Sequence, residues 1–202
     1  MYPTRIPRIL RLLMPGFRWS VDTQEKELYL TFDDGPIPEV TPWVLDQLAT
    51  YNAKATFFCI GRNCAANPEL LQRIRHEGHT IGNHTWDHPR GRRTGTFSYL
   101  RSVLRCQALT GSRFFRPPYG SITKRQSSAM RERFDVVMWD VLSADFDTRL
   151  DGESCLQNVI GHARPGSIVV FHDSLKAEDR LRYALPRTLA HFSAQEYVFK
   201  AL

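Results

Sequence analysis

Residues 27–36 have the sequence ELYLTFDDGP, in which an apolar run leads directly into two adjacent aspartates and a Gly-Pro turn. The apolar and β-branched side chains predict a strand over 27–32, so Asp33 and Asp34 stand at its carboxyl end. A lone Asp-Asp-Gly is often an ordinary turn. Two carboxylates held together at a strand end nevertheless repel unless a cation or a shared proton relieves them. The stretch therefore predicts a charged site at the end of a buried strand.

Short β-rich runs alternate with longer helical patterns along the rest of the chain. We expect seven strands, at 27–32, 54–60, 79–83, 113–116, 134–140, 167–172 and 196–200. We expect six helices between them, at 39–51, 67–77, 96–110, 122–131, 152–163 and 180–192. Asn67 and Pro68 form a good helix start, whereas Pro186 should kink or split the last helix.

Alternation of strands and helices predicts an α/β fold with parallel strands, right-handed crossovers and helices covering the sheet. A barrel and an open doubly wound sheet both satisfy this pattern. Because a full eight-unit barrel usually takes about 250 residues, a chain of 202 residues is expected to have seven units or fewer. Without repeats or linkers, residues 1–202 are predicted to form one domain, with 1–25 as an N-terminal extension.

The composition, 42% hydrophobic and 24% charged, is typical of a soluble folded domain. No apolar run is long enough to cross a bilayer, since the best candidate, 9–14, is interrupted by Arg11. That stretch is also too short for the core of a signal peptide. We therefore expect a cytoplasmic or membrane-associated protein, and the basic, mildly apolar N-terminal stretch is compatible with peripheral contact at a membrane surface.

The net charge of +6 is carried largely by arginine. No aromatic and basic residues interleave as a stacking platform for bases would require, so we expect no nucleic-acid partner and attribute the charge to solubility. Four cysteines, at 59, 64, 106 and 155, show no Cys-x-x-Cys spacing and are predicted to be reduced and structural. Zinc binding by Cys59 and Cys64 is the weaker alternative.

Polar residues follow five of the predicted strands. The carboxyl ends of parallel strands meet at one edge of a sheet or barrel, where ligands bind, so these residues are expected to form one site. They are Asp33-Asp34-Gly35, His84 to His88, Arg116 to Tyr119, Asp145, and His172-Asp173.

The spacing within this set predicts a metal. His84 and His88 are four residues apart, so one helical turn would bring both imidazoles to the same side. Adjacent residues of a strand point to opposite sides, so one aspartate rather than both should coordinate tightly. Two imidazoles and one carboxylate leave open positions, as in catalytic zinc, whereas structural zinc would have a fourth protein ligand. A two-metal site would need further bridging carboxylates, for which Asp87, Asp145 and Asp173 are the only nearby spares.

The motifs, in this order, resemble those of the polysaccharide deacetylases, the NodB homology domain of carbohydrate esterase family 4, over residues 26–200. The resemblance implies a distorted (β/α)7-type barrel, in agreement with the strand count. Residues 31–35, TFDDG, resemble the first motif, which implies Asp33 as catalytic base and Asp34 as metal ligand. Residues 84–88, HTWDH, resemble the second, which implies both histidines as metal ligands.

Of the three later motifs, the third matches the family pattern, whereas the fourth and the fifth each differ from it at one residue. Arg-Pro-Pro-Tyr at 116–119 implies that Arg116 holds the base aspartate and that the Tyr119 backbone amide helps bind the oxyanion. The fourth motif is Asp145-Phe146 where the family has Asp-Trp, and it implies that Asp145 tunes the acid. The fifth, a Leu-x-His pattern with valine for leucine, implies His172 as general acid.

The resemblance implies a hydrolase that removes N-acetyl, or O-acetyl, groups from an amino-sugar oligosaccharide or polysaccharide and releases acetate. It also implies one divalent ion, with Zn²⁺ as the default and Co²⁺ or another ion as the alternative. The expected partner is an acetylated saccharide, which Trp86 and Phe146 are candidates to stack against. The sequence indicates no oligomeric state. Two other functions remain open: hydrolysis of cyclic imides or ureides, and carbohydrate binding without catalysis.

Overall fold

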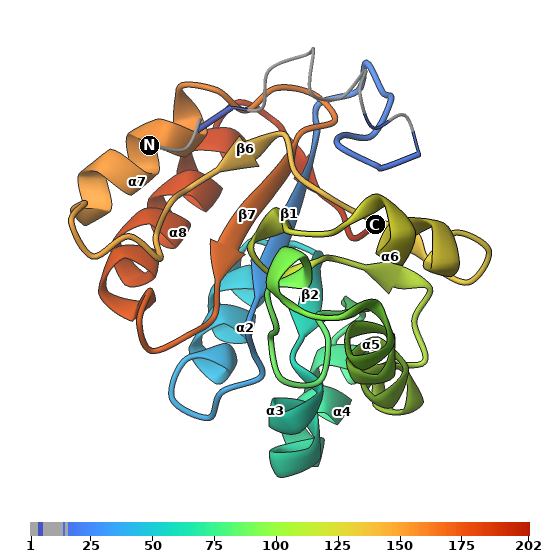
Figure 1. Cartoon of the computed structure of the whole chain (residues 1–202). Coiled ribbons are helices and arrows are strands. Elements are labelled where there is room, and N and C mark those ends of the chain that lie inside the picture. The colour runs from blue at the N-terminus through green and yellow to red at the C-terminus, as the bar shows by residue number, and fades with distance from the viewer. Residues whose placement is uncertain (1–3, 6–13, 15) are drawn as a thin grey trace.

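The computed structural model describes residues 4, 5, 14 and 16–202, so most of the apolar stretch 9–14 and half of the expected N-terminal extension lie outside the described residues. The described strands form one parallel sheet in the order β5-β4-β3-β2-β1-β7-β6, with β8 beside β1 (Figure 1). Their bounds are β1 Glu27–Asp33, β2 Ala55–Cys59, β3 Thr80–Asn83, β4 Phe114–Phe115, β5 Asp135–Val136, β6 Val141–Leu142, β7 Ile168–His172 and β8 Val198–Phe199.

Helices pack around the outside of this sheet (Figure 1). Their bounds are α2 Thr41–Thr50, α3 Gly61–Ala66, α4 Pro68–His76, α5 Thr96–Thr110, α6 Lys124–Met130, α7 Gly152–Ile160 and α8 Glu178–Ser193, with 3-10 turns η1 Gly91–Arg93 and η2 Pro118–Gly120. Among the described residues, no helix has both the length and the apolar character needed to cross a membrane.

Strand β1 shows how the two faces of the sheet divide the core. Leu28, Leu30 and Phe32 belong to the main buried cluster between the sheet and the helices. The alternate residue Tyr29 belongs to a small separate cluster with Phe58, Val137 and Ile168. Since successive side chains of a strand point to opposite faces, Thr31 and Asp33 lie on the same face as Tyr29. One strand therefore carries apolar side chains toward the helices and polar ones toward the inside of the curl.

The segment 134–140, predicted to be one strand, instead forms only the short strand β5 and then crosses toward the opposite edge of the sheet, where β6 begins at Val141. β5 lies at one edge and β6 at the other, although only residues 137–140 separate them. Five residue steps span at most about 18 Å. Seven strands in a flat sheet would set the two edges roughly 29 Å apart. The sheet must therefore curl until its edges approach, which confirms the predicted barrel-type fold in the form of an open, curled sheet.

The helices depart from the sequence expectation in two places. Helix α8 continues from Glu178 to Ser193 across Pro186, so it is not split. Proline removes one backbone hydrogen bond, whereas the buried face of α8, including Leu181, Leu185 and Leu189, packs into the core and holds the helix together. The short helix α3 was not predicted, because six residues with only Gly61 and Cys64 buried show little helical periodicity.

The close approach of β2 and β3 depends on glycine. A Cβ at Gly82 would lie 2.4 Å from the ring of Phe58, which is fully buried. We expect Gly82→Ala to lower the free energy of unfolding by about 1–3 kcal/mol through overpacking. Gly16→Ala is the matched control, since its Cβ would meet no described atom within 4 Å. Urea denaturation measures both variants, and equal midpoints would contradict the packing described for β2 and β3.

Candidate metal centre

Asp34, His84 and His88 come together at the carboxyl ends of β1 and β3. One ligand atom from each lies within 4.8 Å of the others, and this is the one such group of His, Cys, Asp and Glu among the described residues. Oδ1 of Asp34 lies 3.2 Å from Nε2 of His88 and 3.8 Å from Nε2 of His84. The four cysteines are buried and free of disulfides, and none joins this group.

The donor set fits a divalent cation. Oδ1 of Asp34 is buried and has no hydrogen-bond partner among the described residues, which is costly unless a cation satisfies it. Zinc bound at 2.0–2.1 Å by a tetrahedral shell separates its ligand atoms by roughly 3.3 Å, close to the spacing found here. Nδ1 of His84 donates to the carbonyl oxygen of Arg116 at 2.8 Å, which leaves Nε2 as the free lone pair. Burial of this imidazole lowers its pKa, so it is neutral, as a ligand must be.

The two histidines do not share a helical turn, contrary to the sequence interpretation. Thr85 and His88 have φ of 67° and 59°, and residues 84–88 form an irregular loop. Asn83 Oδ1 accepts from the Thr85 amide at 2.9 Å, and Thr85 Oγ1 accepts from the His88 amide at 3.0 Å. These side-chain bonds to the backbone stabilise the loop and bring the ring centroids to 5.0 Å.

The loop that carries Asp34 is held by residues that sequence reasoning had not assigned to it. Asp34 has a φ of 85°, and its carbonyl accepts from the Asn63 amide group on α3 at 2.7 Å. Asp173 accepts from the Gly35 amide at 3.0 Å and from the Thr41 hydroxyl at 2.6 Å. Burial raises the pKa of Asp173 to about 8, while these two bonds oppose the shift. Asn63 could not have been found, because α3 itself was not predicted.

A buried ion pair holds Asp33. Nη1 of Arg116 donates to Oδ1 of Asp33 and to Oγ1 of Thr31, both at 2.7 Å, and Nη2 donates to the Met138 carbonyl at 2.9 Å. Arg116 has no exposed surface. Burial lowers its pKa and Asp33 opposes that shift, so the guanidinium stays charged. The other oxygen of Asp33, Oδ2, lies 4.0 Å from Nε2 of His84, beside the metal ligands.

A second carboxylate holds His172. Asp145 Oδ1 accepts from Nδ1 of His172 at 2.7 Å, and its Oδ2 accepts from the His172 backbone amide at 2.8 Å. Burial opposes the imidazolium, but the charge and hydrogen bond of Asp145, with smaller contributions from Asp34 and Asp33, raise the pKa of His172 to about 9. Arg180 donates to the Asp145 carbonyl at 2.6 Å, and the Phe146 ring lies edge-on to His172 at 5.2 Å.

The remaining predicted site residues are the aromatic side chains of Tyr119, Trp86 and Phe146. Tyr119 has a φ of 60° and is 58% exposed, and its ring lies 4.6 Å from that of His88. Trp86 is half-buried, with the guanidinium of Arg105 3.5 Å above its ring. One face of Trp86 is therefore covered by a cation, whereas Tyr119 lies beside the candidate ligand His88 and Phe146 lies beside the imidazole of His172.

Known proteins share this arrangement of sequence and fold. Residues 20–133 match the family described as polysaccharide deacetylase. A peptidoglycan-N-acetylglucosamine deacetylase of Bacillus cereus is 35% identical over 79% of this chain and 60% of its own length. A chitooligosaccharide deacetylase of Azorhizobium caulinodans is 34% identical over 90% of each chain. The chain therefore spans less than two thirds of the length of the first relative.

The fold has a close match among solved structures. It superimposes on the crystal structure of a peptidoglycan N-acetylglucosamine deacetylase in complex with 4-naphthalen-1-yl-N-oxidanyl-benzamide. The TM-score is 0.88, at 31% identity, over 98% of this chain and 95% of that one.

We expect metal-stripped protein to bind one Zn²⁺ per chain, as measured by competition with a chelating dye. His84→Ala and Asp34→Asn should each weaken binding by more than about 100-fold, because even the loss of a supporting group costs 10–100-fold. His191→Ala, which changes an exposed histidine on α8, is the matched control and should bind zinc as the wild type does. Unchanged affinity in both ligand variants would place the metal elsewhere.

Proposed function

Because the chain belongs to the polysaccharide deacetylase family, we propose that it hydrolyses the acetamide of an N-acetylated amino sugar within a saccharide, releasing acetate and a free amine. One divalent cation, with zinc expected and cobalt as the alternative, takes part. The proposal rests on three groups that lie together at the carboxyl ends of the strands. They are the Asp34–His84–His88 cluster, the Asp33 carboxylate held by buried Arg116, and the His172 imidazole held by buried Asp145.

The ion pair between Asp33 and Arg116 indicates which side chain acts as the base and which one holds it in place. When bound, the cation supplies positive charge that polarises the acetamide carbonyl and lowers the pKa of a coordinated water. Asp33 accepts the proton of the attacking water through Oδ2, since Oδ1 is held by Arg116. Arg116 keeps this carboxylate oriented because its own carbons and nitrogens are fully enclosed. The Tyr119 backbone amide donates to the developing oxyanion.

The acid is His172. Amide hydrolysis requires a proton on the departing nitrogen, and Asp145 keeps this imidazole charged. The backbone amide of His172 also donates to Asp145, so one carboxylate fixes both the position and the charge of the ring. Base and acid are therefore set by separate buried partners, one cationic and one anionic.

Asp33→Asn should retain zinc and lose acetate release by more than about 100-fold, within the range for loss of general base catalysis. Asparagine keeps the size of the side chain but cannot accept the proton. Release of acetate from N-acetylglucosamine oligomers measures turnover, after known ions are added back to metal-stripped protein. Full activity in this variant would refute the role of Asp33.

The activity should fall as pH rises through the pKa of His172, because the protonated imidazole is the acid. Its pKa is about 9 here, and a bound cation offsets the part due to Asp34 and Asp33, so the alkaline limb of kcat is expected at or below pH 9. Asp145→Asn should move this limb to lower pH by more than about one unit, since one unit corresponds to about 1.4 kcal/mol of charge interaction. An unmoved limb in that variant would assign the acid to another group.

The alternatives differ in product. A hydrolase of cyclic imides or ureides would give ring-opened products or ammonia, and a carbohydrate-binding protein would hold saccharide without releasing acetate under any divalent ion. A panel of N-acetylated and O-acetylated saccharides beside cyclic imides separates these outcomes. We expect acetate, and N-acetyl substrates ahead of O-acetyl ones.

A further inference from the structure

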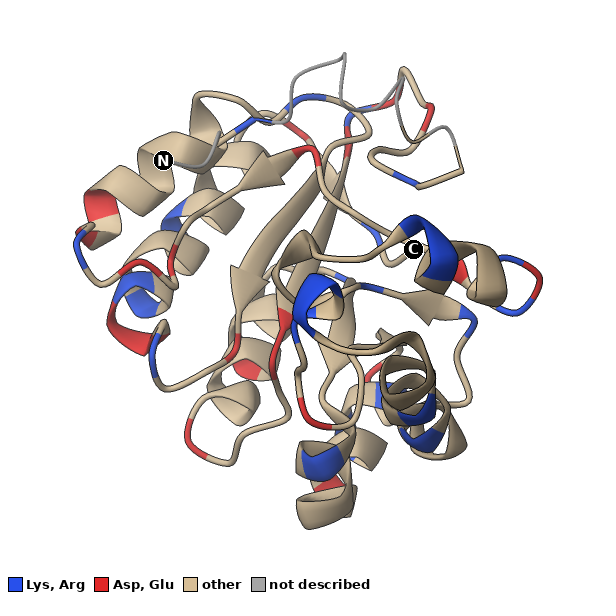
Figure 2. Ribbon diagram, in the orientation of Figure 1, with Lys and Arg blue, Asp and Glu red and all other residues tan. Residues whose placement is uncertain are grey.

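The charges of the chain are unevenly distributed. Residues 88–131 contain ten of the 27 Lys and Arg residues and none of the 21 Asp and Glu residues. This segment includes the end of the metal-binding loop, α5, η2 and α6. Helix α5 accordingly carries blue segments and no red one (Figure 2). Since Arg116 is the one fully buried member of the ten, most of this positive charge is available at the surface.

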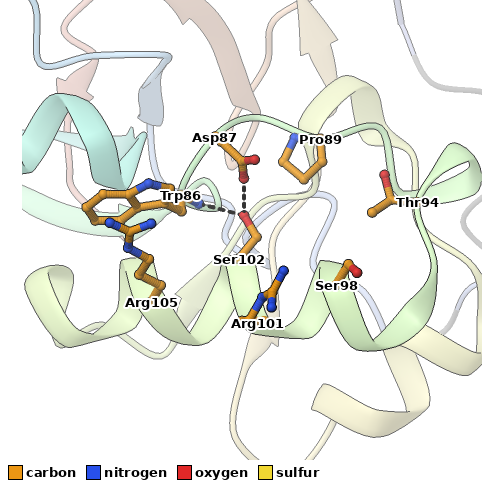
Figure 3. Close-up of a pocket in the computed structure, with 8 residues that line it drawn as sticks. All are labelled: Trp86, Asp87, Pro89, Thr94, Ser98, Arg101, Ser102 and Arg105. Atoms are coloured by element: carbon orange, nitrogen blue, oxygen red, sulfur yellow. Dashed lines mark hydrogen bonds between the residues drawn. The ribbon is translucent and has the colours of Figure 1, made fainter.

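A pocket of about 420 Å³ lies within this region, between the metal-binding loop and α5 (Figure 3). Trp86 and Asp87, from the loop between the ligands His84 and His88, form one wall. Arg101 and Arg105 form the other wall. The pocket therefore begins one residue away from a metal ligand, on the outer side of the same loop.

The two arginines of the pocket are one helical turn apart, so they project from the same side of α5 (Figure 3). Arg105 lies flat on Trp86 at 3.5 Å. Arg101 is exposed and has no ion pair or hydrogen bond with any described residue. The one acid in the wall, Asp87, already accepts from the Ser102 hydroxyl at 2.5 Å. With two guanidinium groups and one carboxylate in its lining, the pocket keeps a net positive charge.

Two further arginines continue this charge toward the metal centre. The Arg90 guanidinium lies 4.3 Å over the ring of Tyr119, which itself contacts His88. The Arg62 backbone amide donates to the Trp86 carbonyl at 3.0 Å, which places Arg62 beside the same loop. Neither side chain is paired with an acid among the residues that the structure describes. We call Arg62, Arg90, Arg101 and Arg105 the arginine arc.

We propose that the arginine arc binds anionic groups on the saccharide, so that the substrate is an acetylated glycan carrying carboxylates or phosphates. The proposal rests on the function proposed above and names its substrate class. Guanidinium groups present paired donors that match a carboxylate or phosphate. Charged side chains of one sign around a cleft also raise the local concentration of an oppositely charged substrate. A neutral glycan would leave these four exposed arginines without an anionic partner.

The test compares three oligosaccharides of equal length with the zinc-loaded enzyme. They are a neutral N-acetylglucosamine oligomer, a strand alternating N-acetylglucosamine with the carboxylated sugar N-acetylmuramic acid, and an N-acetylglucosamine oligomer bearing 6-phosphates. We expect kcat/KM to be at least fivefold higher for one anionic substrate than for the neutral one, and the better of the two identifies the anion. This preference should decline as salt is raised, because the arc is exposed.

Arg101→Gln should reduce the anionic-to-neutral ratio of kcat/KM by about fivefold, the upper range for one exposed ion pair, through KM rather than kcat. Arg101→Lys keeps the charge and should retain most of the ratio. The matched control is Arg133→Gln, an exposed arginine that precedes β5, at the opposite end of the strands from the site, and it should leave the ratio unchanged. Direct calorimetric binding of the preferred oligosaccharide to Asp33→Asn, with and without Arg101→Gln, gives a readout that does not depend on turnover.

Several results would overturn the assignment. Equal kcat/KM on all three substrates would do so while the deacetylase proposal stands. Equal loss on neutral and anionic substrates in Arg101→Gln would show a structural role for Arg101. If Arg101→Gln leaves the ratio intact but weakens sedimentation with phosphatidylglycerol vesicles, the arc serves a membrane surface and the saccharide assignment is wrong. Absence of acetate release from every substrate would instead refute the function itself.

Discussion

The buried ion pair between Arg116 and Asp33 is the interaction on which the rest of the site depends. A guanidinium with no exposed surface is unfavourable unless it is paired and its remaining donors are satisfied. Here Asp33, Thr31 and the Met138 carbonyl satisfy them, and the Phe58 ring lies 4.1 Å below the charge. The Arg116 carbonyl in turn accepts from His84, so one residue orients both the proposed base and a candidate metal ligand.

The curl of the sheet makes this interaction possible. Because β5 and β6 lie at opposite edges but only a few residues apart, the segment between them must cross the gap. That crossing segment contains Met138, whose carbonyl accepts from Arg116. A flat sheet with the same strands would leave the guanidinium without this acceptor and in contact with water. The polar interior and the curvature of the sheet are therefore consequences of the same chain path.

Two histidines at the site have opposite electrostatic character, and the difference comes from their partners. Burial lowers the pKa of His84, whose Nδ1 donates to a neutral carbonyl, so its ring stays neutral and suits a ligand. His172 is partly buried, but its Nδ1 donates to the carboxylate of Asp145, which outweighs desolvation and raises its pKa. The same side chain thus serves two roles, because one partner carries charge and the other does not.

From the sequence alone, the α/β class, most strand positions and the identity of the polar residues at the strand ends could be predicted. Periodicity and composition are local properties, and the carboxyl ends of parallel strands meet by topology. Three features could not be predicted: the end of β5 at Val136 followed by a crossing segment, the short helix α3 with Asn63, and the nonhelical loop at 84–88. The first two depend on contacts between residues distant in the chain, such as Val137 with the inner core and Asn63 with Asp34, whereas the loop depends on side-chain bonds to the backbone that periodicity does not reveal. The arginine arc was visible in the sequence only as net charge; the fold decided that Arg101 and Arg105 line one pocket, with Arg62 beside the same loop and Arg90 over Tyr119, because proximity in space is a property of packing rather than of composition.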